Sequence, residues 1–327
     1  MRVSVVIAAW NAAWCIERAI DSVLGQTQPA HEILVCDDGS TDGTPDRVER
    51  RYGTSVRVLR LPHRNASAAR REGLEQATGD WFAFLDADDV WWPGKLERQE
   101  AWLAGHPEVR WLGSDGRLIS TQGVVRESWL SDYFDPVTDL VGDFSGLLLR
   151  RCFPLVSSML VEAEVYRATG GLDPTIPLAY DYDLWLRLAA RVPGAVLSER
   201  LVDYYTGPAT LSKNFLARYR DDLELMRRAE SGRYGGTPEF RHLAADRAAV
   251  LEFKLALIVM RQGEYAEARE RLRRAARGGS SLQRTLAMGG AWMPDLILSR
   301  LARTEWAKST VAASLPQPAR LTVGEPS

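Results

Sequence analysis

The sequence predicts an α/β fold built on a doubly wound, mostly parallel sheet, and three observations lead to this prediction. Short apolar, β-branched segments alternate with segments of helical periodicity from residue 3 to residue 85. Acidic clusters follow two of the apolar segments directly, at Asp37-Asp38 and at Asp86 to Asp89. The hydrophobic fraction of 46% and the charged fraction of 26% are those of an ordinary soluble globular protein. Because ligands of such sheets bind beyond the carboxyl ends of the strands, the acidic clusters mark the expected site.

Each element is predicted from its own pattern. Apolar, β-branched runs indicate strands, and apolar spacings of three and four residues indicate helices. Pro45 is expected in the first turn of a helix, and Gly79 is expected to close one. Residues 115–150 are predicted to hold loops and short strands. The predicted strands are 3–9, 32–36, 56–61, 81–85 and 111–114, and the predicted helices are 15–24, 45–52, 66–77, 95–103 and 180–191.

The composition changes near Leu211, which predicts three regions. Residues 1–210 form the α/β domain, and residues 211–307 form a helical region rich in Ala, Arg, Glu and Leu. Within it, residues 255–276 resemble the turn of a tetratricopeptide helix pair. One such pair cannot bury its own apolar face, so we expect a single helical hairpin packed on its neighbours. The proline-rich residues 308–327 are predicted to be disordered.

Charge, cysteine content and hydropathy exclude several classes of protein. A net charge of −2 and a pI near 6.2 give no indication of a nucleic-acid partner. Three cysteines, none in a CxxC pair, fit a reducing compartment and not a disulfide framework. We expect no signal peptide, and no apolar run reaches the 18 residues of a membrane span. The predicted location is therefore the cytoplasm.

The cluster of Asp86, Asp88 and Asp89 is the first candidate site. Carboxylates this close repel one another unless a cation is present, and hard oxygen ligands suit Mg²⁺ or Mn²⁺. The alternative is a solvated loop, or a helix cap formed by Asp89 ahead of Trp91-Trp92-Pro93. For Asp89 itself the capping role is the preferred interpretation.

Two further segments are candidates. In residues 37–42, a carboxylate on a tight glycine turn could accept a hydrogen bond from the N–H group of a base; the alternative is a turn in which Ser40 or Thr41 caps the next helix. In residues 65–73, small residues at a helix start with Arg70 one turn on could meet a diphosphate. The alternative there is a surface helix with solvated arginines.

Several segments together resemble glycosyltransferase family 2. They occur in the order of that family and cover roughly residues 1–205. Their joint occurrence is far more specific than any one of them, so it outweighs the alternatives given for single segments. The matching segments are 3–11, 22–27, 33–42, 65–73, 84–89, 170–173 and 181–187.

The resemblance implies a GT-A type fold, a nucleotide-sugar donor with UDP as the favoured nucleotide, a divalent cation, and inversion at the anomeric carbon. Trp10 takes the place of the family's usual tyrosine that stacks on the base, and Asp38 would bind the base N–H group. Asp86 would face the ribose and phosphates, and Arg70 would approach the diphosphate. The implied donor-binding residues are Ala8, Trp10, Asn11, Asp38, Arg70, Asp86 and Ala87, with Asp88 as the metal ligand and Asp181 as the general base.

The sequence departs from the family pattern at two places. Ala8-Ala9 stands where Pro and Thr or Val are common, which changes little if the backbone makes the contacts. Tyr180 stands where the family often has Glu, so one carboxylate is lost. Asp181 is kept as the base that accepts the proton of the acceptor hydroxyl, with Asp183 as the alternative.

The implied acceptor is a glycan or a lipid-linked saccharide, with contacts expected from residues 115–180. The C-terminal helices are expected to pack on the catalytic domain or on a second copy of the chain. The alternative is that residues 269–303 dock on the inner face of a membrane. Two other functions stay open: a sugar-phosphate nucleotidyltransferase, although residues 8–11 lack the glycines of a triphosphate loop, and a non-catalytic binding module.

Overall fold

The computed structural model describes residues 1–206, 215–278, 287–289 and 291, which fall into two compact units. The described part of the first unit is residues 1–144 and 152–206, and that of the second is residues 145–151 together with the described residues from 215 onward. The predicted disordered tail, 308–327, lies outside the described residues. Among the described helices, none is both long enough and apolar enough to cross a membrane.

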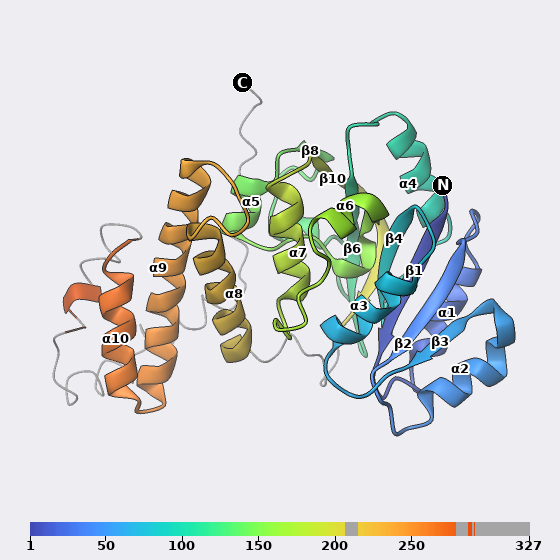
Figure 1. Ribbon diagram of the computed structural model, residues 1–327, viewed down its shortest axis with the longest axis horizontal. Coiled ribbons are helices and arrows are strands. Elements are labelled where there is room, and N and C mark those ends of the chain that lie inside the picture. Colours follow the sequence, from blue (N-terminus) through green and yellow to red (C-terminus); the bar gives the residue numbers. More distant parts are fainter. Residues whose placement is uncertain (207–214, 279–286, 290, 292–327) are drawn as a thin grey trace. The chain divides into compact units, whose positions relative to one another are not determined.

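Ten strands of the described residues form one sheet (Figure 1). Its order is β3-β2-β1-β4-β9-β6-β10-β5, with β7 paired to β6 and β8 paired to β10. The first four strands are mutually parallel, whereas β9 is antiparallel to both β4 and β6. The strands are β1 (Val3–Ala9), β2 (Glu32–Asp37), β3 (Arg57–Arg60), β4 (Trp81–Asp86), β5 (Val90–Trp91), β6 (Trp111–Ser120), β7 (Gly123–Arg126), β8 (Leu140–Gly142), β9 (Leu160–Glu162) and β10 (Gly194–Tyr205).

Strand β1 is the point where the direction of winding reverses. From β1 the chain moves outward through β2 to β3, and it then returns to place β4 on the other side of β1. Crevices at such a reversal are where open α/β sheets bind ligands, beyond the carboxyl ends of the strands. The topology therefore sets the expected site at the ends of β1, β2 and β4.

The helices cover both faces of this part of the sheet. Helix α1 packs its apolar side on one set of alternate β1 residues, which includes Val5 and Ile7. On the opposite face, Gly73 of α3 lies so close to β1 and β2 that an added Cβ would be 2.3 Å from the Cys36 sulfur and 2.9 Å from Val6. The helices of the first unit are α1 (Ile16–Leu24), α2 (Thr44–Tyr52), α3 (Ala66–Gln76), α4 (Lys95–Ala104), α6 (Ala163–Ala168) and α7 (Tyr180–Ala189), with short 3₁₀ turns at Gly53–Ser55, Leu130–Asp132 and Val156–Ser158.

The predicted elements agree with the structure in most places, and two details differ. Gly79 does not close α3, which ends at Gln76; glycine is needed there because a Cβ would lie 2.6 Å from the Ser4 hydroxyl oxygen. The segment Trp91-Trp92-Pro93, ahead of which Asp89 is the candidate cap, opens no helix: Trp91 belongs to β5 and α4 begins at Lys95.

The second unit is helical, as predicted. Helix α9 (Pro238–Arg261) packs between α8 (Phe215–Glu230) and α10 (Tyr265–Ala275), and α5 (Ser145–Arg150) also contacts α9. The turn after Arg261 gives the helical hairpin that the tetratricopeptide-like segment predicted. Inside the unit the buried carboxylate of Glu252 binds Arg227 and Arg271. Much of the segment 269–303, for which docking on a membrane is the alternative, lies outside the described residues.

Lys95, the first residue of α4, is a buried lysine. The Lys95 side chain is fully enclosed; its Nζ donates to Oε1 of Gln99 at 2.7 Å and lies 4.1 Å from the centre of the Trp91 ring. Burial lowers the pKa of this ammonium well below its usual value. Because the unfolded chain binds a proton that the folded chain releases, the free energy of unfolding rises with pH between the two pKa values.

Lys95→Met is expected to remove this pH dependence. Above the lowered pKa of Lys95 and below the ordinary lysine pKa of about 10.4, the wild-type free energy of unfolding should rise by up to about 1.4 kcal/mol per pH unit more than that of the variant. Chemical denaturation at several pH values measures both. Arg98→Met, an exposed change on the same helix, is the control and should keep the wild-type slope. Equal slopes for wild type and Lys95→Met would contradict a neutral buried lysine.

Candidate functional site

The carboxyl ends of three parallel strands bring the predicted residues together. In the sheet register Ala8 of β1 lies opposite Asp86 of β4, and Ala9 lies opposite Asp37 of β2. Asp38 follows at once and donates its backbone N–H to the Ala9 carbonyl at 2.8 Å. The two acidic clusters predicted from the sequence therefore flank the end of β1.

Asn11 fixes the loop that follows β1. Its backbone adopts a positive φ of 49°, a conformation that asparagine tolerates better than most residues. The Asn11 N–H donates to the Ser40 hydroxyl at 2.8 Å, and its side-chain oxygen accepts the Thr41 N–H at 2.9 Å. These two bonds fasten the loop after β1 to the loop after β2. Neither Ser40 nor Thr41 caps the next helix, whose first position is preceded by Gly43.

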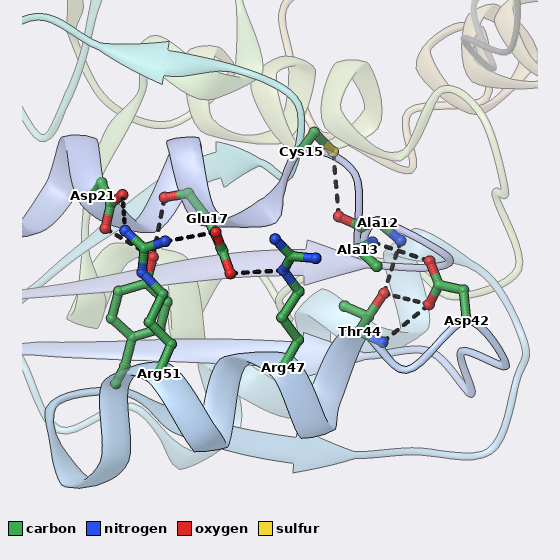
Figure 2. Close-up of polar contacts among 10 residues, drawn as sticks. Ala12, Ala13, Cys15, Glu17, Asp21, Asp42, Thr44, Arg47 and Arg51 are labelled. Carbon is green, nitrogen blue, oxygen red and sulfur yellow. Dashed lines mark hydrogen bonds and ion pairs between the residues drawn. The ribbon is translucent and has the colours of Figure 1, made fainter.

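Asp42 makes the second half of this loop connection (Figure 2). One carboxylate oxygen accepts the Ala13 N–H at 3.0 Å, and the other accepts the Thr44 hydroxyl at 2.5 Å. The Thr44 hydroxyl oxygen in turn accepts the Ala12 N–H at 2.9 Å. Burial alone would raise the pKa of Asp42, but the hydrogen bonds from Thr44 and Ala13 lower it. A charged carboxylate therefore holds the two loops at one spacing.

Asp38, the predicted base-binding carboxylate, is already engaged. One oxygen accepts the Arg64 N–H at 2.8 Å, and the other lies 2.9 Å from Nδ1 of His63. The His63 ring stacks on Trp10, with ring centres 4.9 Å apart and planes inclined by 16°. Trp10 is 54% exposed, so its indole is available at the surface. Sequence reasoning missed His63, because a single histidine in a loop carries no pattern.

Arg70 is enclosed and not solvated. Its side chain is fully buried, and Nη2 donates to Oδ1 of Asp86 at 2.6 Å and to the Leu85 carbonyl at 3.4 Å. Nη1 donates to the hydroxyl of Tyr180. The alternative of a surface helix with solvated arginines is therefore wrong for this residue. Its predicted contact with a diphosphate stays a prediction.

Tyr180, which stands where the family often has Glu, contacts Arg70 in the structure. The sequence showed only that a carboxylate is missing at this position. In the structure the hydroxyl of Tyr180 meets Arg70, and Arg70 binds Asp86, so the first turn of α7 is linked to the end of β4. Burial is the main cause that raises the pKa of Tyr180, which keeps the hydroxyl protonated. The role of Tyr180 could not be predicted from a mismatch alone.

Asp89 is a structural carboxylate, and its predicted role as a helix cap is wrong. Helix α4 begins only at Lys95, with Gly94 before it. The buried carboxylate of Asp89 accepts the Ser157 hydroxyl at 2.5 Å and the Tyr205 backbone N–H at 2.8 Å. Burial and the neighbouring charges of Asp86 and Asp88 raise its pKa well above the usual value. Asp89 thus fastens the acidic turn to β10.

Asp88 is the carboxylate of the turn that is left for a ligand. It is half-buried, and burial together with the charge of Asp86 raises its pKa to about 6. Among the described residues, no group of three or more His, Cys, Asp or Glu side chains encloses a metal position. Mg²⁺ and Mn²⁺ often use only one or two carboxylates together with substrate phosphates, so Asp88 beside the partly exposed Asp86 fits such a cation. Ala87 between them packs on the core.

The two candidate bases of α7 differ in their surroundings. Asp183 is 1% exposed and binds Arg187 at 2.5 Å within the same helix. Asp181 lies in the first turn and is half-buried; its Oδ1 accepts the backbone N–H of Tyr182 at 2.8 Å. The ion pair gives Asp183 a structural role, and this favours Asp181 as the predicted base.

The buried pair of Arg70 and Asp86 should show energetic coupling. Asp86→Asn leaves the Arg70 charge enclosed without its partner and should lower the free energy of unfolding by about 3 kcal/mol. Arg70→Met combined with Asp86→Asn should cost clearly less than the sum of the two single changes. Chemical denaturation of the four proteins completes the cycle. Asp80→Asn, at the other end of β4, is the control; strict additivity would contradict the coupling.

Solved structures share this architecture. TarS from S. aureus, residues 1–349 in complex with UDP, superposes with a TM-score of 0.65 over 99% of this chain and 95% of that chain, at 19% sequence identity. The mannosyltransferase PcManGT from Pyrobaculum calidifontis, in complex with GDP-Man and Mn²⁺, gives 0.60 over 96% and 84%, at 20% identity. At these identities the likeness concerns the fold alone. It confirms the predicted fold class, a nucleotide-sugar transferase fold of GT-A type.

Part of the chain is similar in sequence to a known family. Residues 4–128 match the model of glycosyl transferase family 2, the family that the sequence resembles. An uncharacterised glycosyltransferase of Nostoc is 41% identical over 189 residues, which are 53% of this chain and 55% of that protein. The Escherichia coli glucosyltransferase WfgD, named for transfer from UDP-Glc to α-D-GlcNAc-diphosphoundecaprenol, is 40% identical over 124 residues, 38% of this chain and 49% of that one. The chain spans between 32% and 55% of the length of its first three curated relatives.

Proposed function

We propose that this chain transfers a sugar from a nucleotide-sugar donor, with UDP as the nucleotide, to a hydroxyl group of a glycan or lipid-linked acceptor, with inversion at the anomeric carbon. One observation carries the proposal: Asp38, the Asp86–Asp89 turn and the first turn of α7 meet around the carboxyl ends of β1, β2 and β4. The match of residues 4–128 to the family model supports the activity, and the UDP complex of TarS and the named donor of WfgD support the nucleotide.

The donor would lie across the end of β1. Trp10 offers an exposed aromatic face for the base, and Asp38 offers a carboxylate for the base N–H group. The backbone of Ala8 would line the same place, and Asn11 fixes the loop that carries Trp10. The hydrogen bonds between the two loops mean that this surface is built before a ligand arrives, which limits the entropy lost on binding.

The phosphates would lie at the acidic turn. Asp88, with Asp86 beside it, would hold Mg²⁺ or Mn²⁺, and such a cation would offset the negative charge of the leaving diphosphate. The Mn²⁺ in the complex of PcManGT is consistent with this choice of cation. Arg70 holds Asp86 in one orientation, so the chain places this carboxylate without needing the cation to do so.

Asp181 would take the proton of the acceptor hydroxyl. As the proton leaves, the acceptor oxygen forms a bond to the anomeric carbon and the bond to the diphosphate oxygen breaks, with its electron pair staying on the diphosphate. Attack from the face opposite the leaving group inverts the centre, as in inverting hydrolases. The contacts from Tyr180 through Arg70 to Asp86 hold the first turn of α7, which carries Asp181, at a set position relative to Asp86. Contact of the helical unit with a membrane or a second copy remains a prediction.

Asp88→Asn is expected to abolish cation-dependent donor binding. Calorimetric titration of UDP, GDP and dTDP with and without Mn²⁺ should show tightest binding of UDP with the cation in the wild type, and a UDP affinity independent of Mn²⁺ in the variant. Asp80→Asn, a change at the residue just before β4, is the matched control and should behave as wild type. Unchanged Mn²⁺ dependence in Asp88→Asn would move the metal site elsewhere, and release of pyrophosphate from a nucleoside triphosphate would favour a nucleotidyltransferase.

Asp181→Asn is expected to separate binding from transfer. Affinity for UDP should stay within about twofold of wild type while the rate of sugar transfer falls by about 10²- to 10⁴-fold, because only the proton acceptor is lost. Release of UDP in the presence of acceptor measures the rate. Asp183→Asn should instead lower the melting temperature through loss of the Arg187 pair. Wild-type transfer by Asp181→Asn would assign the base to another residue.

A further inference from the structure

Arg70, the residue that the family resemblance assigns to the diphosphate, offers no exposed positive charge at the turn Asp86–Asp89. The guanidinium of Arg70 is enclosed and directs its N–H groups to Asp86, Leu85 and Tyr180. Its charge is therefore used to balance Asp86. A diphosphate beside Asp86 and Asp88 would add further negative charge to a place that already carries two carboxylates, so a second cation on this side of the site would stabilise it.

Arg18 is a cation in a suitable place. It lies in the first turn of α1 and is exposed, and its guanidinium carbon lies 4.6 Å from the centre of the Tyr205 ring and 5.9 Å from that of Trp14. Within the part of the chain that the structure describes, it forms no ion pair. Aromatic faces hold a guanidinium in position without neutralising it, so its N–H groups stay available for an anion.

The support of Arg18 is joined to the acidic turn itself. The backbone N–H of Tyr205, whose ring lies under Arg18, donates to Asp89 at 2.8 Å. Cys15 lies just before α1, and its environment shows that both charges are near. Burial is the main cause that raises the pKa of its thiol to about 12; the charge of Asp88 adds to the rise and that of Arg18 opposes it. The start of α1 is therefore within the electrostatic reach of Asp88.

Trp14 marks the same place as a binding surface. It is 72% exposed, which is unusual for the largest apolar side chain, and its ring centre lies 5.9 Å from the Arg18 guanidinium carbon. An exposed tryptophan next to an unpaired guanidinium gives a surface that suits a sugar carrying phosphate groups.

We propose that Arg18 binds the diphosphate of the donor opposite Asp88 and stabilises the charge that the leaving group gains. This inference rests on the proposed function. When the bond between the anomeric carbon and the diphosphate oxygen breaks, the electron pair remains on that oxygen, and the N–H groups of Arg18 donate hydrogen bonds to the phosphate oxygens. Arg18 undergoes no chemical change, and Tyr205 and Trp14 hold its guanidinium in position.

The test compares UDP with uridine, which shares the base and ribose but has no phosphate. Titrations with Mn²⁺ present would use the wild type, Arg18→Met, Arg18→Lys and the control Arg50→Met, an exposed change on α2. Arg18→Met should weaken UDP binding by about tenfold or more and leave uridine affinity unchanged, because a charge-assisted contact to phosphate is lost. Arg18→Lys should recover part of the UDP affinity, and Arg50→Met should match the wild type.

Several outcomes would overturn the proposal. Equal UDP affinity in wild type and Arg18→Met would remove Arg18 from the diphosphate site. An equal loss of UDP and uridine affinity, with no recovery in Arg18→Lys, would assign Arg18 a structural role in the loop. A wild-type protein that binds neither UDP nor uridine would contradict the proposed function itself, which is a different result from a wild type that binds both and a variant that is indistinguishable from it.

Discussion

The ion pair between Arg70 and Asp86 joins the parts of the site that come from distant stretches of the chain. Arg70 belongs to α3, Asp86 ends β4, and Tyr180 opens α7, and a single buried guanidinium contacts all three. An enclosed charge is costly unless its partners are in place, so the arrangement favours one relative position of these elements. The family resemblance alone would have left the guanidinium free to approach a ligand.

The acidic turn shows how one short segment divides its work among chemically identical side chains. Asp86 forms an ion pair with Arg70, and Asp89 accepts hydrogen bonds from Ser157 and Tyr205. Asp88 is left to bind a ligand through its carboxylate oxygens. Ser157 reinforces the division, because its hydroxyl oxygen also accepts the Asp86 backbone N–H at 3.0 Å. What differs among the carboxylates is the set of hydrogen-bond donors that the fold brings to each. Arg70 is 16 positions from Asp86, whereas Ser157 and Tyr205 are more than 65 positions from the carboxylates that they contact.

The sequence predicted what depends on local pattern and on family order. Strands such as Val3–Ala9 follow from periodicity, and the helical hairpin after Arg261 follows from the resemblance to a tetratricopeptide helix pair. The placing of Asp38 and Asp86 at strand ends follows from the alternation of strands and helices. Contacts between residues remote in sequence escaped it. Gly79 is glycine because Ser4 is close by, and Asp89 is buried because Tyr205 and Ser157 reach it. No local sequence pattern predicts such contacts, because they depend on tertiary packing.

The stacking of His63 on Trp10 changes what recognition of a base would mean in this chain. Asp38 is 3% exposed, Arg64 holds one of its oxygens, and His63 lies against the other. A nucleotide base that binds the same Asp38 oxygen and the same face of Trp10 would have to displace the His63 imidazole. Its affinity would then be the difference between two sets of contacts that resemble each other, so the ring of His63 sets the reference state against which every nucleotide is compared.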